Sequence, residues 1–289
     1  MMFARVKIFL EMIKFHHTVF ALPFSFTGAI LAAKGLPGAS QSFWIIIAMV
    51  GARTAAMGFN RLIDAEIDAQ NPRTSGRAIP AGLLGKGSVV LFVVIFSMLF
   101  VFASFRLNLL CFYLSLPALA LLALYSYCKR FTSLSHLVLG ACLAAAPLGA
   151  WIAVTGSLGV PAILLGVGVL FWVAGFDILY ALQDLDFDRS AGLYSIPASL
   201  GITSSLRMAR LFHLVLPVVL VTICYLLNLG PLFICGILAS TIMLAYEHWL
   251  LRDADLRMLD NAFFKTNGYI SLVIFIFTLG DLLWRQAKI

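Results

Sequence analysis

The chain has 289 residues, of which 62% are hydrophobic and only 11% are charged, and this composition excludes an ordinary water-soluble domain. The net charge of +7 comes without a basic patch interleaved with aromatic residues, so nucleic acid is not an expected partner. Several apolar stretches are about twenty residues long, enough for a helix to cross the hydrocarbon core of a bilayer. The composition therefore predicts an all-α, polytopic membrane protein surrounded by membrane lipid.

The predicted elements begin with residues 1–14, whose apolar side chains share one helical stripe, as in a short helix that lies in the membrane interface. Nine transmembrane helices are expected after it. Their ranges are 15–34, 42–60, 87–105, 107–127, 134–155, 160–182, 209–228, 231–251 and 267–284. We expect these helices to surround a central cavity and the whole chain, 1–289, to form one integral membrane domain. Nothing in the sequence implies an obligate protein partner.

The distribution of basic residues predicts the orientation of the spans. Most of the twenty Lys and Arg residues fall on one side of the membrane if the N-terminus is cytoplasmic, and short cytoplasmic loops are enriched in these residues. The three longest polar connections, 61–86, 183–208 and 252–266, then also face the cytoplasm. We therefore expect a multi-pass protein of a bacterial cytoplasmic (inner) membrane, capped by loops on its cytoplasmic side.

Acidic residues gather at the cytoplasmic ends of the second and sixth spans. More than half of the thirteen acidic residues stand in two short segments: Asp64, Glu66 and Asp68, then Asp177, Asp184, Asp186 and Asp188. A single carboxylate at a helix end is commonly no more than a solvated cap. Asp177, however, lies inside the sixth span, where an ionisable side chain is costly and usually functional. The loops 61–86 and 183–208 that follow these spans are therefore the expected catalytic loops.

Helical phase assigns these carboxylates to two faces, because side chains rotate by about 100° per residue. One face of the second span holds four polar side chains: Arg53, Asn60, Asp64 and Asp68. One face of the sixth span holds another four: Asp177, Tyr180, Asp184 and Asp188. Glu66 and Asp186 point away from these faces, so we do not expect them to bind a metal ion. Arg53 is expected to face the cavity.

Two facing sets of carboxylates would repel each other in a low-dielectric setting unless cations lay between them. Ligands that are all oxygen favour Mg²⁺, which completes its shell with water and substrate phosphates. Four basic side chains near the two segments could contact the remaining phosphate oxygens: Arg73, Arg77, Lys129 and Arg130. The pattern thus predicts a Mg²⁺-dependent site for a phosphate-bearing substrate.

The two acidic segments resemble the motifs of a known family, the UbiA superfamily of intramembrane aromatic prenyltransferases. Residues 60–68 read NRLIDAEID and residues 177–188 read DILYALQDLDFD, against the family patterns N-D-x-x-D-x-x-x-D and D-x-x-Y-A-x-x-D-x-x-x-D. Arg61 departs from the first pattern, which has Asp there in many members. Four further fragments are similar to the family, so that the resemblance covers nearly the whole chain: HTVFALP at 17–23, RTSGRAIP at 73–80, YSYCKRFT at 125–132 and GLYSIP at 192–197.

This resemblance implies the transfer of a polyprenyl group from polyprenyl diphosphate to a ring carbon of a hydroxylated aromatic acid. The second motif is most similar to the branch that acts on 4-hydroxybenzoate or a related dihydroxynaphthoate, in ubiquinone or menaquinone biosynthesis. The implied Mg²⁺ ligands are Asn60, Asp64, Asp68, Asp184 and Asp188, with Asp177 and Tyr180 as further catalytic residues. The expected substrate contacts are Arg53, Arg73, Arg77, Tyr125, Lys129 and Arg130.

Two other classes of membrane protein stay open at this point. A transporter would also place polar groups within its spans, although the acids here cluster at one membrane face rather than at the midplane. A CDP-alcohol phosphotransferase would also be intramembrane and metal-dependent, but its D-G-x-x-A-R motif is absent from the sequence. Glu247, in the eighth span, could pair with a neighbouring span or touch substrate. The five histidines are interpreted as interfacial or packing residues: His16, His17, His136, His213 and His248.

Overall fold

The computed structural model describes residues 2–13, 15–251 and 262–288, and every regular element in these ranges is a helix. The α-helices are α1 (Met2–Met12), α2 (Phe15–Ala33), α3 (Ala39–Ile63), α4 (Ala65–Gln70), α5 (Lys86–Leu107), α6 (Leu109–Cys128), α7 (Ser135–Thr155), α8 (Val160–Ala181), α9 (Leu185–Ser190), α10 (Ile196–Leu226), α11 (Pro231–Leu250) and α12 (Ala262–Gln286). A short 3₁₀ helix, η1 (Leu182–Asp184), joins α8 to α9.

Eight helical segments in the described part of the chain are long and apolar enough to cross a membrane. They are α3, α5, α6, α7, α8 continued through α9, α10, α11 and α12. The helix α2 coincides with the first predicted span, but its described apolar part, Leu22–Ala33, is shorter. The prediction of an all-α polytopic membrane protein is confirmed, with eight candidate spans and one shorter apolar helix in place of nine spans.

Local sequence explains where several of these helices begin and end. The Asn108 side chain accepts a hydrogen bond from the backbone N–H of Cys111 at 2.9 Å, which starts α6 directly after α5. Ser195 caps α10 in the same way, through the N–H of Ala198 at 3.2 Å. The helix α7 gives way to Gly156, whose φ of 70° is a left-handed conformation that glycine adopts without strain. Such tight connections send consecutive helices back across the bundle.

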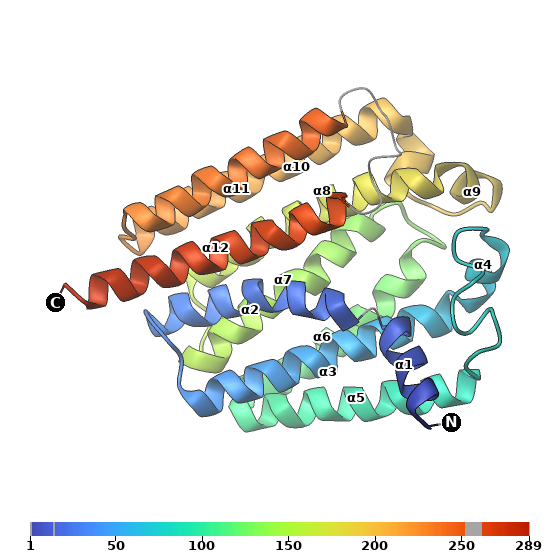
Figure 1. Cartoon of the computed structure of the whole chain (residues 1–289), viewed down its shortest axis with the longest axis horizontal. Coiled ribbons are helices and arrows are strands. Elements are labelled where there is room, and N and C mark those ends of the chain that lie inside the picture. The colour runs from blue at the N-terminus through green and yellow to red at the C-terminus, as the bar shows by residue number, and fades with distance from the viewer. Residues whose placement is uncertain (1, 14, 252–261, 289) are drawn as a thin grey trace.

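The helices run back and forth between the two ends of the bundle (Figure 1). One end, on the right in Figure 1, gathers α4, α9 and the N-terminal helix α1, whereas the C-terminus lies at the opposite end. The most buried span is α8, which packs between α7 and α10. Small residues permit this close approach, because a side chain at Gly140 would collide with the backbone of Leu170 in α8. The second acidic motif therefore begins in the last turns of the most buried span.

The two expected catalytic loops contain more helix than predicted. Residues 61–86 include the end of α3 and the whole of α4, and residues 183–208 include α9 and the first turns of α10. The helix α10 begins at Ile196, whereas hydropathy predicts a span only from residue 209, because the first turns of the helix are too polar to count as part of an apolar span. The helix bends at Gly201, where φ is 77°. The third predicted loop, 252–266, lies mostly outside the described residues.

The N-terminal helix predicted over residues 1–14 is present as α1. Its end packs on the bundle, because Met12 and Ile13 are buried in a cluster with Val89 and Val93 of α5. Phe9 stacks on Phe92 of the same helix, with ring centroids 4.7 Å apart. These contacts fasten α1 beside the end of the bundle that carries the acidic motifs.

Candidate active site

A polar cavity of about 140 Å³ lies at the end of the bundle where α4 and α9 gather. Its walls come from α3, α4 and the connection after α4 on one side, and from α8, η1 and α9 on the other, with the end of α6 between them. Most of the predicted site residues line it: Asn60, Asp64, Asp68, Arg73, Arg77, Tyr125, Lys129, Asp177, Tyr180, Asp184 and Asp188. The fold thus brings both acidic motifs to one space.

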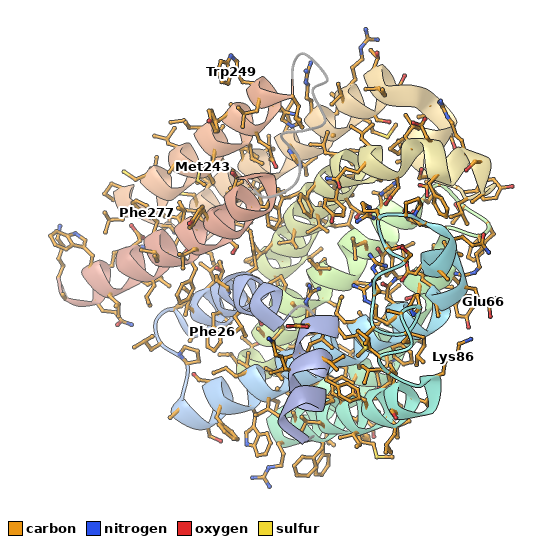
Figure 2. The ribbon with its side chains drawn as sticks, turned by 45° about the vertical axis from the view of Figure 1, so that its right-hand side comes forward. Phe26, Glu66, Lys86, Met243, Trp249 and Phe277 are labelled. Carbon is orange, nitrogen blue, oxygen red and sulfur yellow. The ribbon has the colours of Figure 1, made fainter. Side chains whose placement is uncertain are left out.

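The first motif keeps its helical spacing beyond the end of α3. The backbone N–H of Asp64 bonds to the carbonyl of Asn60 at 2.9 Å, and that of Asp68 bonds to the carbonyl of Asp64 at 2.7 Å. Asp64 and Asp68 therefore stay on one face, toward the cavity. Glu66 points outward, where its side chain is 86% exposed and its carboxylate lies 3.6 Å from the Lys86 ammonium (Figure 2).

In the second motif, the carboxylates also stay on the sides that helical phase predicts, although the helix type changes. The chain tightens from α8 into the 3₁₀ turn of η1 and then continues as α9. Asp184 and Asp188 are buried at the cavity, whereas Asp186 is exposed on the outer side. The sides taken by these residues agree with helical phase, although the single continuous helix that the phase argument assumed is interrupted.

An ion pair connects the second motif to the connection after α4 across the cavity. The Arg73 guanidinium donates to Asp184 through both Nε, at 2.8 Å, and Nη2, at 2.5 Å, a bidentate pair between residues 111 positions apart in the chain. The Asn71 side chain donates a third hydrogen bond to the same carboxylate, at 3.1 Å. Arg73 also lies over the Tyr180 ring, 5.6 Å from its centroid. Asp184 is therefore held by the connection after α4.

Three of the other four carboxylates of the cavity, Asp64, Asp68 and Asp188, each face a basic side chain as well. Arg77 Nη1 lies 2.6 and 2.7 Å from the two oxygens of Asp68, and Arg130 Nη1 lies 3.2 Å from Asp64. Burial raises the pKa of the Asp64 carboxyl above its ordinary value, and the charge of Arg130 opposes that shift. Lys129 Nζ lies 3.9 Å from Asp188. Negative charge in the cavity is thus balanced by cations from the connections.

Asn60 and Arg61 form a hydrogen-bonded chain at the edge of the cavity. Asn60 Nδ2 donates to Asp64 at 2.6 Å, and Asn60 Oδ1 accepts from Arg61 Nη1 at 3.0 Å. Arg61 is buried and also donates to the backbone of Met12 in α1 at 3.4 Å. The residue that departs from the family motif therefore contacts Asn60 and α1, and the Asn60 amide bridges Arg61 and Asp64.

The donor chemistry of the cavity fits Mg²⁺. Asp64, Asp68, Asp184 and Asp188 supply only hard oxygen ligands, the type that Mg²⁺ prefers. Asp188 Oδ2 is buried without a hydrogen-bond partner in the described part of the chain, although a buried carboxylate oxygen normally needs one. Among the described residues, no three acidic, His or Cys side chains converge closely enough to hold a metal in this conformation. The basic partners would have to leave the carboxylates first.

Two predicted substrate contacts do not line the cavity. Arg130 contacts Asp64 from outside the cavity lining, and its guanidinium donates hydrogen bonds to the carbonyls of Ser126 at 2.8 Å and Ile63 at 2.7 Å. Arg53 lies on α3, and its Nε is buried without a hydrogen-bond partner among the described residues. Both side chains stand next to the cavity wall rather than within it.

Sequence reasoning missed two residues that contact the predicted site. Asn71 bonds to Asp184, and its position seven residues after Asp64 continues the same helical face, a signal that could have found it. His136, interpreted as an interfacial or packing residue, instead lies 2.7 Å through Nδ1 from Asp177. A pairing between separate helices leaves no local pattern in the sequence.

The remaining predicted polar residues lie apart from the cavity. Glu247 accepts a hydrogen bond from Asn267 of α12 at 2.5 Å and lies 3.8 Å from His213 of α10, so it pairs with neighbouring helices. His248 contacts His213 at 2.9 Å. The side chains of His16 and His17 lie outside the described part of the chain.

Comparison with known proteins identifies relatives over most of the chain. Residues 21–269 match the UbiA prenyltransferase family. A 4-hydroxybenzoate octaprenyltransferase from Yersinia enterocolitica is 32% identical over 248 residues, which cover 85% of each protein. One from Francisella tularensis is 28% identical over 251 residues, covering 86% of this chain and 87% of that protein.

Solved structures agree with the sequence relatives. The apo structure of a UbiA homolog from Aeropyrum pernix K1 superposes with a TM-score of 0.84 at 28% identity, covering 92% of this chain and 98% of that one. A UbiA homolog from Archaeoglobus fulgidus, bound to DMAPP and Mg²⁺, shares the fold with a TM-score of 0.75 at 16% identity, over 95% of this chain and 99% of that one. On the match to the family over residues 21–269, this protein is a multi-pass membrane prenyltransferase that belongs to the UbiA prenyltransferase family.

Proposed function

We propose that this protein transfers a polyprenyl group from polyprenyl diphosphate to a ring carbon of a hydroxylated aromatic acid, in a Mg²⁺-dependent reaction of quinone biosynthesis. The acceptor is 4-hydroxybenzoate or a related dihydroxynaphthoate. Relatives named 4-hydroxybenzoate octaprenyltransferase support this choice of acceptor. The observation that carries the proposal is a single cavity with carboxylates on facing walls and basic side chains between them. Family membership favours prenyl transfer over a transporter or a CDP-alcohol phosphotransferase.

The carboxylates of the two motifs would hold the metal ion in this proposal. Asp64 and Asp68 offer oxygens from one wall, and Asp184 and Asp188 offer oxygens from the other. When bound, Mg²⁺ supplies positive charge that stabilises the diphosphate as it leaves. Asn60 donates a hydrogen bond to Asp64 and would therefore orient that carboxylate. Its own side-chain oxygen is also expected to bind the metal ion directly.

Basic side chains would exchange their partners when substrate enters. Arg73, Arg77 and Lys129 hold carboxylates in the structure, and all three are partly exposed to the cavity. Diphosphate oxygens are strong acceptors for guanidinium and ammonium groups, and metal binding would occupy the carboxylates. The exchange keeps every charge paired, because each cation moves from a carboxylate to a phosphate.

The aromatic acid would bind at the deeper end of the cavity, beside Asp177 and Tyr125. Arg53 lies close enough to Tyr125 for an electrostatic interaction, and its buried Nε has no hydrogen-bond partner among the described residues. It would turn toward the cavity to meet an acceptor carboxylate or the diphosphate. The allylic C–O bond breaks and diphosphate leaves with the electron pair. A ring carbon captures the allylic cation, and loss of the ring proton restores aromaticity. Exclusion of water by the surrounding helices protects the cation.

Product formation tests the proposed function directly. Purified protein in detergent is supplied with Mg²⁺, a panel of prenyl diphosphates and several aromatic acids. We expect one combination to yield a C-prenylated aromatic acid together with one equivalent of inorganic diphosphate. Diphosphate release without a prenylated aromatic product, across the whole panel, would contradict the proposed acceptor class. The product of the best combination also identifies the chain length and the acceptor.

We also propose that the cavity end of the bundle faces the cytoplasm, as the excess of basic residues at that end supports. The loops 61–86 and 183–208 would then receive diphosphate substrate from the cytoplasm. Single cysteines at Ser75, which is exposed beside the cavity, and at Leu36, which is 67% exposed in a turn at the opposite end, distinguish the two sides. In a background without native cysteines, a membrane-impermeant thiol reagent should label Leu36→Cys from outside intact cells. Outside labelling of Ser75→Cys would reverse the orientation.

A further inference from the structure

His136 is a fully buried histidine whose two ring nitrogens connect three helices. It stands at the start of α7, with 0% of its side chain exposed. Nδ1 lies 2.7 Å from Oδ2 of Asp177 in α8. Nε2 lies 3.2 Å from the backbone nitrogen of Ile196, the first residue of α10. Both polar atoms of the ring are therefore used, and one of them contacts a residue of the cavity.

The contact with Ile196 determines which nitrogen of the ring carries the proton. A backbone N–H can only donate, so Nε2 must accept and carries no proton. The neutral ring then has its proton on Nδ1, where it donates to the Asp177 carboxylate; this tautomer is assigned from the hydrogen bonds.

Asp177 occupies a different part of the cavity from the other carboxylates. It precedes Asp184 by seven residues, so it lies about 10 Å deeper along the helix. The other lining carboxylates face the basic side chains of the connections, whereas Asp177 contacts the imidazole of His136. With Oδ2 held by His136, the second oxygen of the partly exposed carboxylate has no hydrogen bond to another described residue and can meet a ligand in the cavity.

We propose that His136 is a positioning residue that orients the Asp177 carboxylate toward the phenolic hydroxyl of the aromatic acceptor. The inference rests on the proposed function for the identity of the acceptor. A fixed carboxylate that accepts a hydrogen bond from the hydroxyl increases the electron density of the ring, and this favours attack by a ring carbon. His136 itself touches neither substrate. Its effect passes through Asp177, so it should change turnover and acceptor binding but leave binding of the prenyl diphosphate unchanged.

A purely structural role is the alternative, because the bond from Ile196 also anchors the start of α10. Two substitutions separate these roles. In His136→Asn the amide nitrogen can take the place of Nδ1, which preserves the bond to Asp177 and loses the bond from Ile196. In His136→Gln the amide reaches the place of Nε2, which preserves the bond from Ile196 and loses the bond to Asp177. His136→Leu removes both bonds.

Kinetics of the three variants in the full-length protein test the positioning role. We expect His136→Asn to keep kcat within about fivefold of the wild type, and His136→Gln and His136→Leu to lose about thirtyfold or more. KM for the prenyl diphosphate should stay constant in all three, while KM for the acceptor rises in the Gln and Leu variants. In an Asp177→Asn background, His136→Leu should cost less than about twofold more, because the two residues act as one unit.

Thermal unfolding in detergent and nitrogen-15 NMR of histidine-labelled protein complete the test. The proposal would be overturned if His136→Asn were as inactive as His136→Leu. It would also be overturned if the rate losses of His136→Leu and Asp177→Asn were additive in the double variant. The NMR spectrum should show a neutral ring protonated at Nδ1, assigned by its loss in His136→Asn; a ring protonated at Nε2 would also overturn it. The NMR result does not need any acceptor. If the wild type forms no prenylated product, the proposed function fails separately, and the substrate role of His136 fails with it while the tautomer is still decided.

Discussion

Two buried polar clusters of this protein differ in the partners of their carboxylates. At the cavity, Asp68 and Asp184 are paired with the long side chains of Arg77 and Arg73, which rise from a connection between helices. Between α10, α11 and α12, Glu247 accepts from an asparagine amide and lies near a histidine ring. The first cluster pairs charge with charge across a space, whereas the described contacts of the second come from an asparagine amide and a histidine ring on adjacent helices.

The difference shows that a buried acid within a membrane bundle is not by itself a catalytic group. Either cluster costs free energy to place among apolar helices. Among the described residues, the first cluster has a cavity beside its carboxylates and cations that can move to an incoming anion. The second uses its hydrogen bonds to hold three helices together. Access and exchangeable partners, rather than burial, therefore distinguish the candidate site from a structural cluster.

The largest contrast is expected between carboxylates that face the cavity and carboxylates that do not. Asp64→Asn and Asp188→Asn should each lose at least about 10² in rate, because each removes a charge that we propose holds the metal near the leaving diphosphate. Glu66→Gln and Asp186→Asn should stay close to the wild type. Initial rates across a range of Mg²⁺ concentrations measure the difference, with thermal unfolding as the check on folding. Equal inactivity of Asp186→Asn and Asp188→Asn would mean that α9 rearranges and that both side chains reach the metal.

A smaller loss is expected from a change at Arg53, whose Nε has no hydrogen-bond partner among the described residues. Arg53→Leu should lower kcat/KM by about 10- to 100-fold, the range for one hydrogen bond to a charged group. The same substitution at Arg106, which stacks over Trp44 at the far end of the bundle, is the matched control. A folded Arg53→Leu protein with normal kinetics for both substrates would remove this residue from the site.

A conservative change at Arg73 should have a still smaller effect. Arg73→Lys keeps the charge but cannot make the bidentate contact that the guanidinium makes with Asp184. An ammonium group also cannot bind a phosphate in this bidentate way, so we expect about five- to tenfold weaker binding of prenyl diphosphate and little change in turnover. Binding of inorganic diphosphate with Mg²⁺, measured by calorimetry, provides a readout without catalysis. Unchanged diphosphate affinity in Arg73→Lys would argue against the proposed exchange of partners.

These comparisons also show what the sequence could predict. Asp64 and Asp68 share a face because they are four residues apart, and the same spacing relates Asp184 and Asp188, so local periodicity was sufficient to place each pair. It could not predict the Arg73–Asp184 pair, which spans 111 positions, or the His136–Asp177 pair, which joins two helices. Contacts of that kind depend on how helices pack, and helix packing leaves no period in the sequence.

The fold, too, has parts that the sequence predicts and parts that it does not. Apolar length located the spans, since hydrocarbon thickness sets the length of a helix that crosses it. The same criterion missed the short helices α4 and α9, because these segments border the cavity and carry its polar residues. It also missed the polar first turns of α10. The parts of the chain that hydropathy describes least well are therefore those that build the site.

The smallest effect on activity is expected from the second cluster. Glu247→Leu removes the acceptor of the Asn267 hydrogen bond and the carboxylate near His213, which should lower the free energy of unfolding by about 1–3 kcal/mol. Activity of the folded fraction should stay within about twofold of the wild type, with the same dependence on Mg²⁺. Thermal midpoints in detergent and KM for both substrates measure the two effects separately. Asp188→Asn should show the opposite pattern, with activity lost and stability largely kept. A Glu247→Leu protein of normal stability but altered Mg²⁺ dependence would instead connect this cluster to the cavity, and the distinction between the two regions would fail.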